Sequence, residues 1–144
     1  MIEIKRVESI DPELLEGIQN LFPQLTQFSP IPDEDQLRQI INSDSTTIWV
    51  AKDNDQTILG MLNLTIYRTT TGVHAWIEDV VVDQAARRQG IAARMTQAAI
   101  DHSRNKGAKA INLTSRPARE AANLLYLKLG FTKVETNLYR MKLD

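Results

Sequence analysis

Two periods of hydrophobicity divide this chain into predicted strands and helices. Residues 2–7 alternate apolar and polar side chains, which is the period of a half-buried strand. Apolar residues then recur every three or four positions in two stretches. Asp11 stands before Pro12 at the start of the first, and Asp33 stands three residues before Gln36 in the second. Because both are helix-start signals, we expect one strand followed by two helices.

The middle of the chain is rich in strand signals. Apolar and β-branched residues fill 46–51, 57–67 and 73–82, and polar turns separate them at 53–56 and 69–72. Because links this short join antiparallel neighbours, the pattern predicts successive hairpins.

From about Gly90 onwards, stretches with helical spacing alternate with stretches that have strand signals. The predicted elements are a helix from about Gly90 to Arg104, a strand at 109–114, a helix from Pro117 or Ala118 to Leu129, and short final strands at 131–134 and 137–143. A strand–helix–strand unit makes a right-handed parallel crossover. We therefore expect a single α/β domain over 1–144. Its mixed sheet has antiparallel N-terminal strands and one parallel pair, and about four helices flank it.

Composition excludes several classes of function. Seventeen basic and eighteen acidic residues give a net charge of −1, so we expect no nucleic-acid partner and no anionic membrane partner. The absence of cysteine removes disulfides, thiolate metal sites and a cysteine nucleophile. His74 and His102 have no metal-ligand spacing, so no metal is predicted. No window reaches the length of a membrane span, and we expect a cytoplasmic protein; a homodimer is left open.

The link between residues 73–82 and the helix after it has a composition typical of anion binding. The valine run 80–82 leads through Arg87 and Arg88 to Gly90, where helical spacing begins. The first N–H groups of a helix have no intrahelical acceptor, and the helix dipole adds positive charge there. A glycine lets a ligand approach the backbone closely. The alternative is an ordinary helix start with solvated arginines.

Two motifs carry a resemblance to a known family. Arg87-x-x-Gly90-x-Ala92 resembles the pyrophosphate loop of the GCN5-related N-acetyltransferases (GNAT), with alanine in place of a second glycine. Ala122-x-x-x-Tyr126-x-x-x-Gly130-Phe131 is similar to that family's second conserved block, and it follows the first in the expected order. The order of elements over 1–144 resembles the family fold as well.

The resemblance implies an acetyl-coenzyme A site between the strands at 73–83 and 109–114. Backbone groups of the first strand would pair with the pantetheine arm, and the turn after it would surround the pyrophosphate. The residues implied in cofactor binding are Val80, Val81, Val82, Arg87, Arg88, Gln89, Gly90, Ile91, Ala92, Asn112, Arg119, Asn123 and Tyr126. The residues alone leave other readings open. Asn112 suits a satisfied sheet side chain, Arg119 a solvated cation and Asn123 a surface residue.

Two residues are candidates for catalysis. Periodicity alone favours a core position for Tyr126, whereas the resemblance implies that its hydroxyl protonates the leaving thiolate. Glu78 and Asp79 lie in an apolar strand, where alternation places them on opposite faces. One of them suits a general base for an amine, and the family resemblance favours Glu78; the alternative is a loop cap or a surface ion pair.

The sequence therefore predicts an N-acetyltransferase that transfers an acetyl group from acetyl-CoA to a primary amine by direct attack. The acceptor is left open between a small molecule and a peptide. The competing interpretations are a coenzyme A-binding sensor without turnover and an interaction domain of the same fold.

Overall fold

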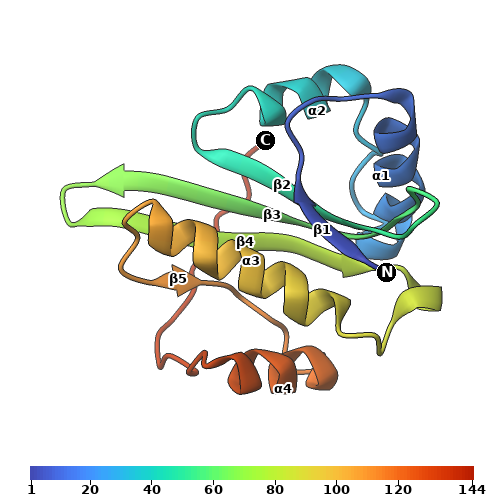
Figure 1. The fold of residues 1–144 in the computed structure, drawn as a ribbon. Helices are drawn as coiled ribbons and strands as arrows, with labels where there is room; N and C mark the ends of the chain where they lie inside the picture. Colours follow the sequence, from blue (N-terminus) through green and yellow to red (C-terminus); the bar gives the residue numbers. More distant parts are fainter. The chain divides into compact units, whose positions relative to one another are not determined.

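A five-stranded mixed sheet runs through residues 1–114 in the spatial order β1-β2-β3-β4-β5 (Figure 1). The computed structural model describes residues 1–144 as two units, 1–114 and 115–144. The strands are β1 Glu3–Arg6, β2 Thr46–Lys52, β3 Ile58–Thr69, β4 Gly72–Val82 and β5 Ile111–Asn112. Strands β1 to β4 pair antiparallel and β4 pairs parallel with β5, which confirms the predicted mixed sheet.

Helices cover both faces of this sheet. They are α1 Pro12–Leu25, α2 Glu34–Ile41 and α3 Ile91–Asn105, with a 3-10 turn η1 at Gln84–Ala86 before α3. Helices α1 and α2 lie on one face and α3 lies on the other (Figure 1). None of the helices has the length and apolar character that a membrane crossing requires.

The two predicted helix starts are confirmed in atomic detail. The Asp11 carboxylate accepts a hydrogen bond of 2.8 Å from the Leu14 amide. Asp33 and Gln36 form a complete capping box, in which each side chain accepts from the other residue's backbone N–H. These bonds satisfy N–H groups that the helix itself leaves without acceptors.

The core of the first unit has two layers, one on each face of the sheet. On the α1 and α2 face, buried residues of both helices pack against Val50 and Met61. On the α3 face, Met95 and Ile91 lie over Gly60, where an added Cβ would come within 3.0 Å of the Met95 methyl group. Gly60 therefore lets α3 approach the sheet closely.

Residues 115–144 contain the helix α4, Glu120–Leu129, which ends at Gly130 with φ of 106°. The helix starts later than Pro117, with Arg119 as its N-cap residue. Within this unit the ring of Tyr126 meets the ring of Phe131 edge-on at 5.8 Å between centroids. The expectation of one domain over 1–144 stays a prediction.

Three predicted strand assignments need correction. The strand expected at 109–114 has only two paired residues, and residues 131–134 and 137–143 form no strands. The unit 115–144 contains no strand that could offer residues 131–143 a hydrogen-bonded edge. Leu138, Tyr139 and Leu143 in this segment are exposed. Alternation makes a segment suitable for a sheet, but a strand also needs a paired neighbour.

Candidate functional site

The turn between β4 and α3 leaves the start of α3 uncapped. Gly90 is the N-cap residue, with φ of 75°, and no side chain bonds to the first helical amides. The earliest helix bond is from the Arg94 N–H to the Gly90 carbonyl, so the amides of Ile91 and Ala92 have no intrahelical acceptor. Several N–H donors and the positive end of the helix dipole thus converge at one place.

Gly90 is required by backbone conformation and not by neighbouring atoms. A Cβ added there would meet no atom within 4 Å, yet its positive φ disfavours any residue with a side chain. Arg88 adopts a similar φ of 66° without being glycine, which is a strained conformation for an L-residue. The space above Gly90 is open, and this geometry fits an anion held closely against the backbone.

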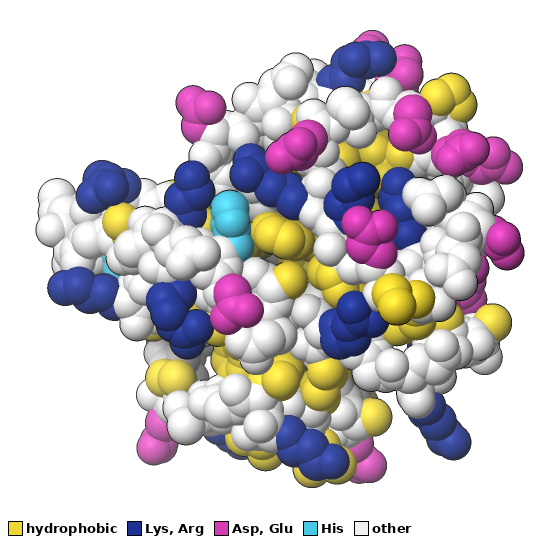
Figure 2. Space-filling view, in the orientation of Figure 1, with side chains coloured by type: hydrophobic (Ala, Val, Ile, Leu, Met, Phe, Trp, Pro, Cys, Tyr) yellow, Lys and Arg dark blue, Asp and Glu magenta, His cyan; other side chains and the backbone are white.

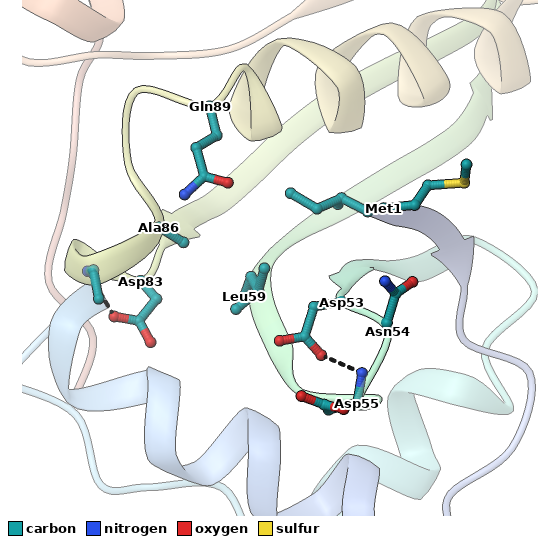
Figure 3. A pocket seen from close by; sticks show the side chains of 10 residues that line it. Met1, Asp53, Asn54, Asp55, Leu59, Asp83, Ala86 and Gln89 are labelled. Carbon is teal, nitrogen blue, oxygen red and sulfur yellow. Dashed lines mark hydrogen bonds between the residues drawn. The ribbon is translucent and has the colours of Figure 1, made fainter.

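The side chains of the turn point in different directions. The Arg87 Nε donates a hydrogen bond of 3.3 Å to the Val82 carbonyl, so this side chain folds back on the end of β4. Arg88 is exposed. The Gln89 side chain points into a hollow of about 410 Å³ that Met1, Asp53 and Asp83 also line (Figure 3). The exposed Arg88 side chain makes no hydrogen bond or ion pair and is available for contact with an anion.

Strand β4 has an unpaired edge on the side facing β5. Pairing with β5 is limited to Ala75 and Trp76, so the backbone from Ile77 to Val82 has no strand neighbour there. The Val81 side chain is buried in the core between the sheet and α1, leaving its backbone for any ligand contact. An unpaired strand edge of this kind is the type to which an extended molecule can add as an extra strand. Beyond Trp76, β4 is thus unpaired on the side where the resemblance implies the cofactor, and the cofactor site itself stays a prediction.

A bulge in β4 separates the two candidate carboxylates. The register with β3 shifts at this point, and Asp79 has a φ of 55°. Asn63, opposite Glu78, donates a hydrogen bond of 2.9 Å from its side-chain amide to the Asp79 carboxylate. Glu78 is exposed and makes no side-chain hydrogen bond or ion pair. The predicted strict alternation across this pair is wrong, because a bulge adds a residue and interrupts the period of two.

Asn63 is a residue of this site that the sequence prediction missed. It is the only amide side chain between Ile58 and Leu64, in an otherwise largely apolar strand. That isolated polar position was the available signal. Its bond explains how Asp79 holds an unfavourable backbone conformation, since the side-chain contact anchors the bulge.

The remaining residues predicted to bind the cofactor lie in β5 and in the unit 115–144. Asn112 lies in β5, opposite Trp76, and is half-buried. Arg119, Asn123 and Tyr126 belong to the unit 115–144. There the Asn123 side-chain amide donates to the Arg116 carbonyl at 3.0 Å, which favours a structural role for it.

Tyr126 is 8% exposed and keeps its proton at neutral pH. Burial raises the pKa of its hydroxyl above the ordinary value of 10.0, and the positive charge of Arg119 offsets part of that effect. A protonated phenol is the form that a general acid requires.

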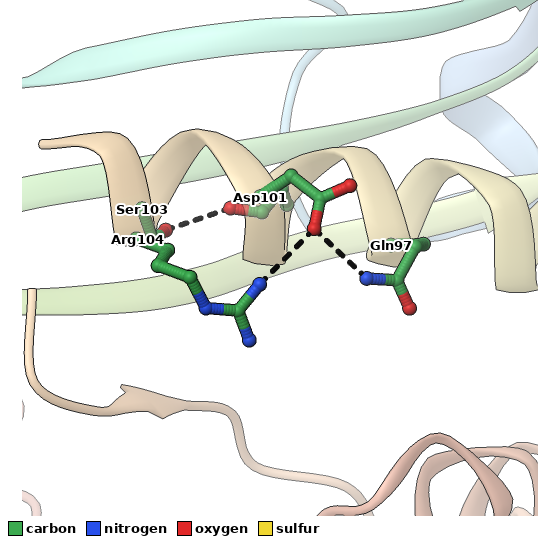
Figure 4. A network of polar contacts seen from close by, with 5 residues as sticks. Gln97, Asp101, Ser103 and Arg104 are labelled. Carbon is green, nitrogen blue, oxygen red and sulfur yellow. Dashed lines mark hydrogen bonds and ion pairs between the residues drawn. The ribbon is translucent and has the colours of Figure 1, made fainter.

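The outer surface of α3 and its surroundings carry mixed charges. Asp101 accepts hydrogen bonds from Gln97 and from Arg104 along the exposed side of the helix (Figure 4). Lysine and arginine side chains are scattered among acidic ones on the face that Figure 2 shows, and they form no continuous basic surface there.

Comparisons with known proteins identify the family. The pattern of the Acetyltransferase (GNAT) family matches residues 13–131. N-alpha-acetyltransferase 30 of Schizosaccharomyces pombe is 36% identical over 97 residues, which are 67% of this chain and 63% of that protein.

Solved structures share the fold over almost the whole chain. An aminoglycoside acetyltransferase from an uncultured soil metagenomic sample, in complex with sisomicin, has a TM-score of 0.87 and 20% identity, covering 99% of this chain and 97% of its own. The acetyltransferase AAC(6')-Iy, in complex with a coenzyme A bisubstrate analogue, has a TM-score of 0.80 and 20% identity, covering 100% and 99%. The family match covers most of the chain and includes both sequence motifs, so this chain belongs to the acetyltransferase (GNAT) family.

Proposed function

We propose that this acyltransferase transfers an acetyl group from acetyl-CoA to a primary amine by direct attack, without a covalent enzyme intermediate. The observation that carries the proposal is the uncapped start of α3 at Gly90, beside the unpaired edge of β4. One element supplies donors for a pyrophosphate and the other supplies a backbone edge for an extended pantetheine arm.

The turn and the strand would hold the donor in complementary ways. Amides at Ile91 and Ala92, with the exposed Arg88, bind the pyrophosphate charge. Backbone groups of Val80 to Val82 orient the pantetheine arm, and backbone N–H donors at the bulge polarise the thioester carbonyl. Acetyl-CoA supplies an activated acyl group and a thiolate leaving group.

Glu78 is the proposed general base. An alkylamine is mostly protonated at neutral pH and must lose a proton before its nitrogen attacks. The Glu78 carboxylate is exposed and unpaired, so it is free to accept that proton directly or through a water. Asp79 already accepts a hydrogen bond from Asn63, which makes it the weaker candidate.

Tyr126 is the proposed general acid, on the basis of its place in the Ala122 to Phe131 motif. As the amine nitrogen bonds to the acetyl carbon, the carbon–sulfur bond breaks and the thiolate takes a proton. The Tyr126 hydroxyl carries its proton at neutral pH and can supply it to the thiolate.

The named relatives support an amine acceptor. The Schizosaccharomyces pombe relative is named for N-alpha acetylation, and several of the structural neighbours are named for aminoglycosides. These names describe two different acceptor sizes and agree on the reacting group.

A free-thiol assay tests the proposal most simply. Acetyl-CoA is incubated with the protein and a panel of amines, from alkylamines and aminosugars to peptides, and the release of coenzyme A thiol is followed. Acceptor-dependent release is expected. Coenzyme A binding without release for any amine would instead identify a binding module.

A further inference from the structure

Part of the sheet face that α1 and α2 pack against carries a locked set of aromatic side chains. The register places Thr46, Thr65, Trp76 and Asn112 in one row across β2 to β5, and Tyr67 opposite His74 in the next row. We call these two the aromatic rows. They lie on the same face as Ile48, which α1 and α2 cover, because paired residues and residues two apart share a face.

The two helices cover only the other end of this face. Their packed row is Val50, Met61 and Val81, towards the end of β4 that leads into α3. The β3–β4 hairpin projects well beyond α1 and α2 (Figure 1). Tyr67 is accordingly 38% exposed, and Trp76 is half-buried. Large aromatic side chains are normally buried, so an open set calls for an explanation.

Hydrogen bonds hold these aromatics in fixed positions. The Trp76 Nε1 donates to the Tyr67 hydroxyl at 3.1 Å, and the Tyr67 ring stacks on the His74 ring with centroids 5.4 Å apart. The His74 Nε2 in turn bonds to the hydroxyls of Thr69 and Thr71, each at 2.8 Å. A preorganised surface loses little conformational entropy when a ligand binds, which favours binding.

The charges nearby favour a cation. Glu78 is two residues from Trp76 on the same strand and face, and its exposed carboxylate has no basic partner. The aromatic rows contain no lysine or arginine, and Arg68 belongs to the row that points to the opposite face. The face of an indole ring attracts cations. The backbone positions of Glu78 and Trp76 are roughly 6–7 Å apart along β4, the rise of two strand residues.

We propose that Trp76, oriented by Tyr67, binds a second ammonium group of the acceptor while Glu78 meets the reacting amine. This inference rests on the proposed function and assigns its substrate class. The acceptor is a small molecule with two amines roughly 6–7 Å apart, the spacing along the strand from Glu78 to Trp76. Linear diamines and aminosugars share that chemistry.

A matched pair of acceptors tests the inference. Thiol release from acetyl-CoA is measured with 1,4-diaminobutane and with butylamine, which has the same carbon chain and one amine. We expect kcat/KM to favour the diamine by about three- to thirtyfold, the range of a cation–aromatic contact. Neamine, an aminosugar, is a second acceptor with paired amines. Comparing its kcat/KM with that of 1,4-diaminobutane shows whether the protein prefers aminosugars or linear diamines.

Variants of Trp76, Tyr67 and Trp49 test whether the preference for the diamine comes from Trp76. Trp76→Leu should bring the ratio of the two kcat/KM values close to one, and Tyr67→Phe should lower it partly, because the indole loses its hydrogen-bond acceptor. Trp49→Leu is the matched control, since Trp49 packs against His102 on the α3 face. The inference is overturned if Trp76→Leu reduces both acceptors equally, or if a lysine-containing peptide is preferred to both diamine sources.

A binding measurement separates this inference from the proposed function. In Trp49→Phe, Trp76 is the only tryptophan, so its emission should change saturably as 1,4-diaminobutane is added. If no amine releases thiol but the emission responds, the binding surface stands and the transferase proposal fails. If thiol is released and the emission of Trp76 does not respond, the surface is wrong and the transferase proposal stands.

Discussion

At the scale of single residues, the bulge in β4 gives two adjacent carboxylates different surroundings. Asp79 takes a left-handed backbone conformation and is bonded to Asn63, whereas Glu78 extends into solvent. Sequence alone identified the pair as unusual in an apolar strand. It could not distinguish the two, because the bulge depends on a partner sixteen residues away.

Glu78→Gln tests the general base. Turnover should fall by about a hundredfold or more, since the amine loses its proton acceptor, and coenzyme A affinity should stay nearly unchanged. The measurement is the pH profile of kcat/KM with a saturating donor. Asp79→Asn is the control, because asparagine still offers an oxygen to Asn63. A fall in Asp79→Asn with an unaltered Glu78→Gln would transfer the role to Asp79.

Tyr126→Phe tests the general acid while keeping the ring against Phe131. Turnover should fall by roughly tenfold to a thousandfold, with the melting temperature and coenzyme A affinity little changed. Tyr126→Ala should also lower the melting temperature, because it removes the ring. Parent-like turnover in Tyr126→Phe, with chemistry rate-limiting, would leave this tyrosine a packing role only.

At the scale of elements, α3 begins at an uncapped turn and ends against the sheet. Near its C-terminal end His102 meets Trp49 of β2 edge-on, with ring centroids 5.3 Å apart. Burial first, and then the charges of Arg6 and Lys106, lower the pKa of His102 below its ordinary value of 6.5.

This lowered pKa predicts an acid-sensitive fold. Below about pH 6.5 the unfolded chain takes up a proton at His102 that the folded protein resists, so stability is lost as the pH falls. Urea unfolding at pH 7.5 and 5.5 should show a smaller loss in His102→Gln than in the parent. His74→Gln serves as the control. An equal loss in the parent and His102→Gln would show that His102 does not contribute.

Elements with local signals were predictable, and elements that depend on distant partners were not. The starts of α1 and α2 rest on contacts within three residues, and both were correct. Whether β5 and the segment 131–144 form strands depends on a neighbouring strand that offers a free edge. The hydrophobic period of the segment itself carries no information about that neighbour. Helical spacing of apolar residues does not reveal that Thr96 and Ser103 of α3 are buried, which is tolerated because each hydroxyl donates to a carbonyl one turn back.

At the scale of the whole molecule, the predicted element order and mixed sheet brought the Arg87–Ala92 turn to the end of β4, where the structure has it. The open rows with Trp76 were not predicted. They required the register of β3 against β4 and the reach of α1 and α2, and both are properties of the folded chain.

The central claim is that coenzyme A binds at the Gly90 turn, and calorimetry of Gly90→Val against Gly107→Val tests it most directly. Both glycines have a positive φ and no atom near an added Cβ, and they lie at opposite ends of α3, so the two variants carry similar strain. Gly90→Val should weaken coenzyme A binding by about ten- to a hundredfold, as charge-assisted hydrogen bonds are lost. Gly107→Val should bind as the parent does. Parent-like binding by a folded Gly90→Val would contradict the account.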